Sequence, residues 1–422
     1  MNEAFIQYIW KMKLFNHSAL KTTEGDNILI INSGIHNFHS GPDFTNARIK
    51  IGDTTWAGNV EIHIKTSDWK NHHHPRDRAY DNVILHVVYE HDDAENKLPT
   101  LILKDLIDGE LISVYNFMMQ TSAWIPCEKN IRSIPEIIIK DQLTRLLTER
   151  IEKKALDFEQ RLYLNKNDWE ETCYQLIARN LGTNINADPF ERVARSLPYK
   201  TILKHNNNPM QIEALLFGQA GFLEGNFREI YPHQLQAEYK FLKKKYDLEG
   251  IRPLEWKFLR MRPANFPTIR MSQFANFVAK NDKIFSKIID LTDPKKIKNL
   301  FDVQAADYWK EHYHFKKSVS VKSTTLGNDM INLILINTIV PLLFLFGKSN
   351  GDDQFIIRAV DLLENLDAEN NAIIRNWGNI GIKPKHAGES QGLLELKNNY
   401  CSNKRCLECA LGHKILKSDQ KV

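Results

Sequence analysis

The feature that constrains the fold most is a change in the spacing of apolar residues at about residue 130. Before this point apolar and polar residues alternate between turn signals, which is typical of half-buried strands. After residue 137 apolar residues recur three and four positions apart, which is typical of amphipathic helices. The sequence therefore predicts an α+β protein, in which a small mixed-sheet N-terminal domain precedes a mainly α-helical region.

Three parts are expected along the chain: an α+β domain over residues 1–130, an α-helical domain over 131–395 and a Cys-rich tail over 396–422. Length alone favours such a division, because 422 residues exceed what one hydrophobic core usually supports. With 42% hydrophobic and 26% charged residues, the composition is that of a folded protein. The net charge of +4 is compatible with a polyanionic partner but does not require one.

Two segments bear on location. The N-terminus lacks the uninterrupted apolar run of a secretory signal peptide. The most apolar run, residues 333–346, contains Asn337 and Pro341 and is shorter than the ~20 residues that a membrane crossing needs, so it is predicted to be a buried helix.

Five cysteines are too few for a disulfide framework in this chain. A cytoplasmic protein without a membrane partner is expected, and its oligomeric state is left open.

The N-terminal pattern predicts one helix followed by four strands. A Gly52-Asp53 turn joins the second strand to the third, and a His-rich connection precedes the fourth. This order places Asp43, Glu61 and His63 close together on one sheet. The expected helix covers residues 3–15, and the strands cover 27–32, 47–51, 56–65 and 82–90.

The strand that ends at Lys65 carries the main candidate site. Alternation puts Glu61, His63 and Lys65 on one face and apolar residues on the other. Asp43 lies just before the hairpin partner strand, so that two carboxylates could converge on one hard cation and activate a water molecule for hydrolysis. The alternative is a solvated polar face without any site.

The connection that follows is rich in histidine. His72 and His74, with Asp77 nearby, are candidate accessory residues, because imidazoles ligate transition metals and transfer protons near neutral pH. They would share a face only in an extended segment, so the sequence does not select the ligands. A histidine-rich Zn²⁺ hydrolase of a small molecule would use the same residues. His86, inside an apolar strand, is predicted to be a core histidine.

A cysteine cluster near the C-terminus is the most specific local motif. Cys406 and Cys409 have the spacing at which two thiolates chelate one tetrahedral ion, and Cys401 precedes them. The fourth ligand could be His413 or the distant Cys127, which would connect the two ends of the chain. A zinc site remains open, as does a set of reduced cysteines without metal.

A basic and aromatic stretch occurs in the helical part. Arg260, Arg262 and Arg270 lie among Trp256 and other aromatic residues, a combination that favours phosphate contacts and base stacking. In the alternative, the aromatic side chains fill a core and the arginines pair with carboxylates such as Glu255.

Several motifs resemble a family of uncharacterised bacterial proteins that is defined only as a domain of unknown function. The N-terminal motifs are Gly41-Pro42-Asp43-Phe44 and Val60-Glu61-Ile62-His63, and the resemblance extends over nearly the whole chain to Tyr400-Cys401 and Cys409. It implies no established activity.

The N-terminal region also resembles the PD-(D/E)XK nuclease superfamily, through Pro42-Asp43, the spacing to Glu61 and the restriction-endonuclease-like order of helix and strands. The resemblance implies that Asp43 and Glu61 bind Mg²⁺ or Mn²⁺ and that Glu3 is an accessory acidic residue. His63 stands where that superfamily has lysine, and Lys65 lies on the same face.

Two readings of the function follow. The resemblance implies a divalent-metal-dependent nuclease that acts on nucleic-acid phosphodiesters. Some members of that superfamily hold an iron–sulfur cluster with one remote cysteine and a clustered trio, which implies the ligand set that includes Cys127. The rival is a non-catalytic nucleic-acid-binding or scaffold protein with a structural metal site.

Overall fold

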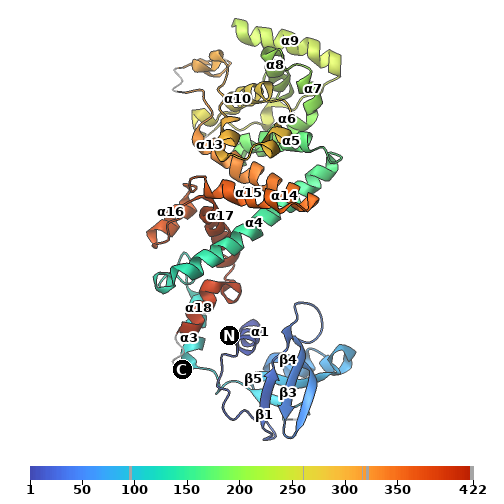
Figure 1. Ribbon diagram of the computed structural model, residues 1–422, viewed down its shortest axis with the longest axis vertical. Helices are drawn as coiled ribbons and strands as arrows, with labels where there is room; N and C mark the ends of the chain where they lie inside the picture. Colours follow the sequence, from blue (N-terminus) through green and yellow to red (C-terminus); the bar gives the residue numbers. More distant parts are fainter. Residues whose placement is uncertain (95–96, 260, 316, 320–322, 419–422) are drawn as a thin grey trace. The chain divides into compact units, whose positions relative to one another are not determined.

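The computed structural model describes residues 1–94, 97–259, 261–315, 317–319 and 323–418 (Figure 1). It divides into two compact units. The N-terminal unit comprises Met1–Gln142, Asn379–Gly381 and Glu395–Val422, and the helical unit comprises Leu143–Gly378 and Ile382–Leu394. A mixed sheet in the first unit and helices in the second make the protein α+β, as predicted.

Six strands form the sheet of the N-terminal unit. The four predicted strands are present, and two short ones, which are too brief to show a period, were not predicted from the sequence. β4 pairs with β5 and β5 with β6 in parallel, whereas the other pairs are antiparallel. The order is β1 (Ile28–Asn32), β3 (Phe44–Ile51), β4 (Thr54–Lys65), β5 (Val83–Glu90) and β6 (Thr100–Ile102), with β2 (Ile35–His36) also paired to β3.

Two glycines fix how β4 meets its neighbours. Gly52 has φ +58° in the predicted turn between β3 and β4, a conformation that glycine adopts without strain. Gly58 lies where β4 approaches β5 closely, since a Cβ there would stand 2.4 Å from Ile84 Cγ2 and 2.6 Å from Asn82 O. Only glycine therefore permits this approach.

The parallel pairing of β4 with β5 requires a crossover connection. Residues 66–82 supply it and contain α2 (Asp68–Asn71), η1 (His74–Arg76) and η2 (Arg78–Tyr80). The crossover and α1 (Glu3–Met12) both contact β4. The polar face of that strand is therefore covered, and Glu61 and His63 are 5% and 1% exposed.

The C-terminal segment belongs to the N-terminal unit and packs against its helices. The Lys397 ammonium donates to the Trp124 carbonyl at 2.9 Å, and the Ala410 amide donates to Gln142 Oε1 at 3.1 Å. These bonds join segments that lie more than 260 positions apart in the sequence. The elements concerned are α3 (Gly109–Gln120), η3 (Ile131–Ser133), η8 (Leu396–Cys401), η9 (Cys406–Glu408) and α18 (Ala410–Ser418).

The helical unit packs around one apolar core that includes the fully buried side chains of Trp309, Tyr174 and Phe217. α4 (Glu136–Leu164) enters it from the N-terminal unit. Most of its helices follow the predicted spacing. The longer ones are α5 (Trp169–Leu181), α6 (Thr183–Ser196), α8 (Pro209–Gln219), α9 (Ile230–Tyr246), α10 (Pro267–Lys280), α14 (Val340–Asn350) and α15 (Asp353–Glu364).

Shorter elements complete the helical unit. They are α7 (Tyr199–Leu203), η4 (Pro253–Glu255), η5 (Pro263–Asn265), α11 (Ile284–Asp290), α12 (Pro294–Asn299), η6 (Asp307–Lys310), β7 (His312–His314), β8 (Lys317–Ser318), α13 (Asn328–Ile334), η7 (Leu335–Ile339), α16 (Ala372–Asn379) and α17 (Ala387–Glu395).

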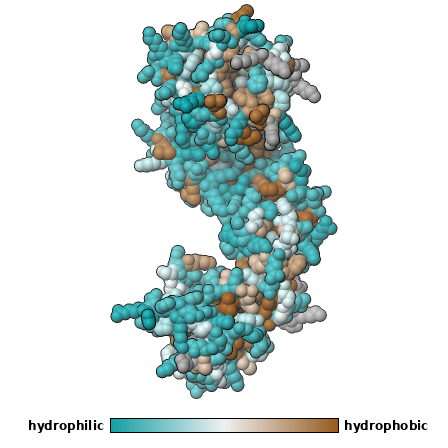
Figure 2. Space-filling view, turned by 180° about the vertical axis from the view of Figure 1, so that it is seen from behind, coloured by the Kyte–Doolittle hydropathy of each residue, from teal (hydrophilic) through white to brown (hydrophobic). Residues whose placement is uncertain are grey.

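The most apolar segment runs through α13, η7 and α14 without interruption, from Asn328 to Asn350. It is long and apolar enough to cross a membrane, but 78% of its most apolar window is buried within the protein. A core helix of a soluble protein has the same character. The surface of the protein seen in Figure 2 is largely hydrophilic, with scattered apolar side chains.

A buried carboxylate organises one side of the helical unit. Glu191 on α6 is 4% exposed and accepts hydrogen bonds from three guanidinium groups. Arg179 and Arg195 each donate at 2.6 Å, and Arg161 on α4 also donates. Because a buried charge is stable only when it is paired, these bonds make Glu191 a structural residue that links α4, α5 and α6.

Candidate metal centre

Hydrogen bonds of Asp43 and Glu61 join the start of β3 to β4. Glu61 Oε2 accepts a hydrogen bond from the Asp43 amide at 3.0 Å. The two oxygens of Asp43 accept from the Ile62 amide at 3.1 Å and from the Gln7 side chain at 2.8 Å. The sequence-predicted pair of carboxylates therefore does converge, and Gln7 of α1, which was not predicted, helps to hold it.

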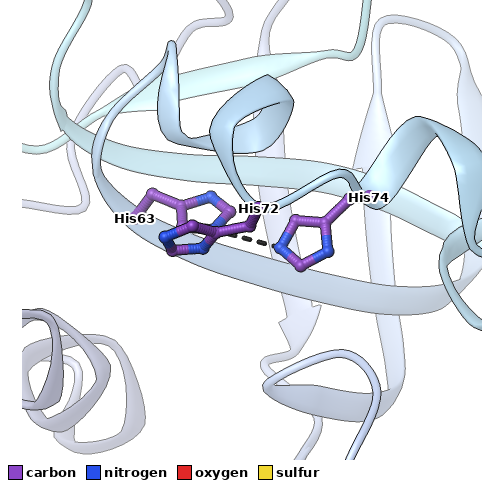
Figure 3. Close-up of side chains that lie close together, drawn as sticks. All are labelled: His63, His72 and His74. Carbon is purple, nitrogen blue, oxygen red and sulfur yellow. Dashed lines mark hydrogen bonds between the residues drawn. The ribbon is translucent and has the colours of Figure 1, made fainter.

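Three imidazoles lie close together (Figure 3), and the carboxylate of Glu61 lies next to them. His63 projects from β4, whereas His72 and His74 come from the crossover, and one ring nitrogen of each lies within 4.8 Å of the other two. His63 Nε2 is 3.1 Å from His72 Nδ1 and 3.3 Å from His74 Nε2. Glu61 Oε1 lies 3.3 Å from His74 Nε2 and 3.7 Å from His63 Nε2.

These distances match those between the ligands of a single ion. A tetrahedral ion with metal–nitrogen bonds of about 2.05 Å holds its ligand nitrogens about 3.3 Å apart. The two contacts of His63 Nε2, at 3.1 and 3.3 Å, are close to that value. One cation among the three rings would accept a lone pair from each of these nitrogens.

His86 orients the central imidazole. Its Nε2 lies 2.8 Å from His63 Nδ1, and both rings are buried. If His63 binds a cation through Nε2, its Nδ1–H donates to His86, an arrangement that typically fixes the tautomer and orientation of metal-bound histidines. His86 was predicted to be only a core residue. The register pairs it with Glu61 on the adjacent parallel strand, which the sequence pattern did not reveal.

Two of the three converging imidazoles, those of His63 and His74, and the ring of His86 are held in the neutral form that metals bind. Burial, and then the neighbouring imidazoles, lower the pKa of His63 to about 2. Burial and His74 lower the pKa of His86 to about 4. Burial and His72 also lower the pKa of His74. Because a metal competes with protons for the same lone pairs, low pKa values remove that competition near neutral pH.

The carboxylates of the site lie close to one another. Burial, and then Asp43 and Glu3, raise the pKa of Glu61 to about 8. Burial also raises the pKa values of Asp43 and Glu3. Glu3 is partly exposed, and its Oε1 lies 3.9 Å from His63 Nε2. Like charges in a buried place disfavour ionisation, and a divalent cation would relieve this repulsion.

The remaining predicted residues of this region lie at its edge. Lys65 is the exposed last residue of β4 and is not a member of the histidine cluster. Asp77 caps η2 by accepting from the Ala79 amide at 2.9 Å, and its charge raises the pKa of His74. Tyr80, which was not among the predicted site residues, stacks on His74 with ring centroids 3.8 Å apart.

We expect His86→Leu to weaken Mn²⁺ binding about 10- to 100-fold, because removal of an outer-shell partner frees the ring of His63. The measurement is a calorimetric titration of the metal-free protein. His86→Gln is the matched variant, since its amide oxygen can accept from His63 Nδ1 and should preserve most of the affinity. Equal affinities for wild type and His86→Leu would contradict an orienting role.

The predicted basic stretch lies in the helical unit. Arg270 is 5% exposed, and its guanidinium donates to Gln273 at 2.9 Å and to Asn265 at 2.6 Å, so it is used inside the unit. Arg262 is exposed at the start of η5. Arg260 lies outside the described residues.

Four of the five cysteines line one pocket in the N-terminal unit. Cys127 meets Cys401, Cys406 and Cys409 there, and none of these four is in a disulfide. His413, the alternative fourth ligand, directs Nε2 to the Leu407 carbonyl at 2.5 Å and is absent from the pocket lining. Cys173 is fully buried in the core of the helical unit.

Fold and site together define a class: an α+β protein whose N-terminal mixed sheet carries a compact cluster of imidazoles and carboxylates, followed by a helical unit. The chain belongs to the family described as protein of unknown function (DUF2851), which matches residues 3–372. Comparison with curated proteins and with solved structures gave no significant match.

Proposed function

We propose that the N-terminal unit is a metal-dependent hydrolase that cleaves phosphodiester bonds of nucleic acids. One observation carries the proposal: ring nitrogens of His63, His72 and His74 converge at ligand spacing beside the buried carboxylate of Glu61. Metal-assisted hydrolysis needs such a set, because it must hold a cation and leave a polarised water next to a base.

The donor set favours Mn²⁺ over Mg²⁺. Mg²⁺ prefers oxygen ligands, whereas imidazole suits transition metals and carboxylate suits Mn²⁺. In this proposal His63, His72, His74 and Glu61 hold the ion. Asp43 is a positioning residue, since both its oxygens accept hydrogen bonds and its amide holds Glu61.

The chemistry follows from the ion and its surroundings. A divalent cation lowers the pKa of its water and neutralises charge on a phosphate oxygen. Glu3 is the candidate base for the proton of that water, because its carboxylate is partly exposed and approaches the imidazoles from α1. Burial and Asp43 raise its pKa, which increases its basicity.

Surface groups around the site suit an anionic, base-bearing substrate. Arg76 and Arg78 are exposed on the crossover close to His74. Phe38, 78% exposed, lies beneath the ammonium of Lys11 at 5.7 Å, on the loop that leads to Asp43. Cations beside an exposed aromatic ring are what phosphate contacts and base stacking require.

We expect the double variant Arg76→Ala, Arg78→Ala to raise KM for a nucleic-acid substrate about tenfold at low salt, while the Mn²⁺ affinity stays unchanged. The reason is that these side chains would contact phosphates and not the ion. Steady-state kinetics at two salt concentrations, with Arg48→Ala as an exposed control on β3, provide the measurement. An unchanged KM would remove these arginines from the substrate surface.

The function itself is tested by cleavage of labelled DNA and RNA with Mg²⁺, Mn²⁺ or Zn²⁺. Wild type should cleave with Mn²⁺, and Glu61→Gln should be slower by more than about 100-fold because it loses an anionic ligand. Glu24→Gln is the control, since Glu24 is exposed. Equal cleavage by wild type and Glu61→Gln would indicate a contaminating nuclease and contradict the proposal.

A second candidate is a Zn²⁺-dependent hydrolase of a small molecule. It is favoured by the three imidazoles, because catalytic zinc sites commonly use three protein ligands and leave one position for water. The same assay distinguishes the two candidates. Zn²⁺-dependent cleavage of a small phosphodiester, without cleavage of DNA or RNA, would support this second function.

A further inference from the structure

The pocket formed by the cysteines is separate in chemistry from the histidine centre. Cys127 lies between α3 and η3, whereas Cys401, Cys406 and Cys409 belong to the C-terminal segment. All four line the same pocket although 274 positions separate Cys127 from Cys401. No described cysteine is in a disulfide, so each of the four keeps a thiol sulfur that can bind a metal.

Two lysine side chains, which donate to backbone carbonyls, hold the two cysteine-bearing segments together without the cysteines. The Lys397 ammonium donates to the Trp124 carbonyl at 2.9 Å. The Lys404 ammonium donates to the carbonyls of Met119 and Thr121, the latter at 3.3 Å. Gly412 completes the packing, because a Cβ there would lie 2.1 Å from the Cys406 carbonyl oxygen. The meeting of the thiols is therefore built into the unit.

The ligand set is four cysteines and excludes His413. The ring of His413 uses Nε2 on the Leu407 carbonyl and lies 5.2 Å from the ring of Tyr8, centroid to centroid. The pocket lining contains Cys127 and lacks this histidine. A set of thiolates alone selects soft or borderline metals and rejects Mg²⁺ and Ca²⁺.

The spacing of the sulfurs favours a cluster over one ion. A single Zn²⁺ with bonds of about 2.3 Å holds its sulfurs about 3.8 Å apart. Among the described residues, the group whose ligand atoms all lie within 4.8 Å of one another is formed by histidines, so the cysteine sulfurs are not gathered as closely as one Zn²⁺ would require. A cluster places an inorganic core between the thiolates. The lining is otherwise mainly apolar, with Met118, Pro126 and Leu396.

We propose that Cys127, Cys401, Cys406 and Cys409 bind an iron–sulfur cluster. Such a cluster is held by four thiolates, and each cysteine releases its thiol proton when its sulfur binds iron. It connects the segment after α3 to the C-terminal segment of the same unit. This proposal is independent of the hydrolase proposal, because it uses none of the residues of the histidine centre.

The test is metal and acid-labile sulfide analysis of the full chain, purified anaerobically and also reconstituted with ferrous iron and sulfide. Wild type should contain about two or four irons per chain with matching sulfide, and show a broad visible thiolate-to-iron absorption. Cys127→Ala and Cys401→Ser should each lose at least half of the iron. His413→Ala, and Cys173→Ala in the helical unit, should keep all of it.

Three results would overturn the proposal. They are stoichiometric zinc without iron, wild-type protein without bound metal after reconstitution, and full iron content in Cys127→Ala. Circular dichroism of each variant reports whether the chain is still folded. A variant that loses iron but keeps the wild-type spectrum therefore supports direct ligation.

Discussion

Replacement of His74 by alanine is expected to weaken Mn²⁺ binding by more than about 100-fold, which exceeds the loss typical of outer-shell changes. His74 Nε2 lies 3.3 Å from both His63 Nε2 and Glu61 Oε1, so its removal takes away a donor at the centre of the set. Calorimetric titration of the metal-free variant measures the loss. The cleavage rate at a fixed Mn²⁺ concentration should fall with it.

The adjacent His73 provides the matched control. It is exposed and has φ +63°, a left-handed conformation that asparagine also tolerates, so His73→Asn should fold and bind Mn²⁺ like wild type. The comparison of these two variants therefore distinguishes the loss of a metal ligand from a nonspecific effect of replacing a histidine. Equal affinity in His74→Ala and His73→Asn would contradict the proposed ligand set.

Glu191→Ala is expected to lower the free energy of unfolding by about 3 kcal/mol, at the lower end of the range for breaking a buried ion pair. We expect a value at the lower end because the side chains of Arg179 and Arg195 are 39% and 49% exposed, so that these charges are only partly buried. Three guanidinium groups lose their shared acceptor. Urea denaturation followed by circular dichroism measures the change.

Two comparisons make this stability prediction specific. Glu159→Ala, at an exposed position of α4, should change the unfolding free energy by less than about 0.5 kcal/mol. Mn²⁺ affinity of Glu191→Ala should match wild type under conditions where it is folded, because Glu191 belongs to the helical unit. A loss below about 1 kcal/mol would show that the arginines find other partners.

Local patterns were sufficient for part of the fold and of the site. Alternation in β4 correctly put Glu61 and His63 on one face, because strand side chains alternate regardless of context. Helical spacing after residue 137 predicted a mainly helical second part, which the helical unit confirms. The spacing of Asp43 from Glu61 predicted their approach, which the pairing of β3 with β4 produces.

Features that depend on the crossover could not be predicted in this way. The parallel pairing of β4 with β5 brings His72 and His74 over the face of Glu61, and it sets His86 beside His63. Parallel and antiparallel strands show the same alternation of side chains, so the sequence pattern could not show which histidines converge. The choice of Cys127 over His413 likewise depends on contacts between segments far apart in the chain.

The most direct test of the hydrolase proposal titrates Mn²⁺ into metal-free wild-type protein while bound ion and cleavage are followed together. Electron paramagnetic resonance counts free Mn²⁺, and a labelled nucleic acid reports cleavage. We predict that cleavage rises in proportion to occupancy and reaches its maximum at one ion per chain, because one set of converging ligands holds the ion. Full occupancy of the histidine centre without cleavage, or cleavage before any ion is bound, would contradict the proposed function.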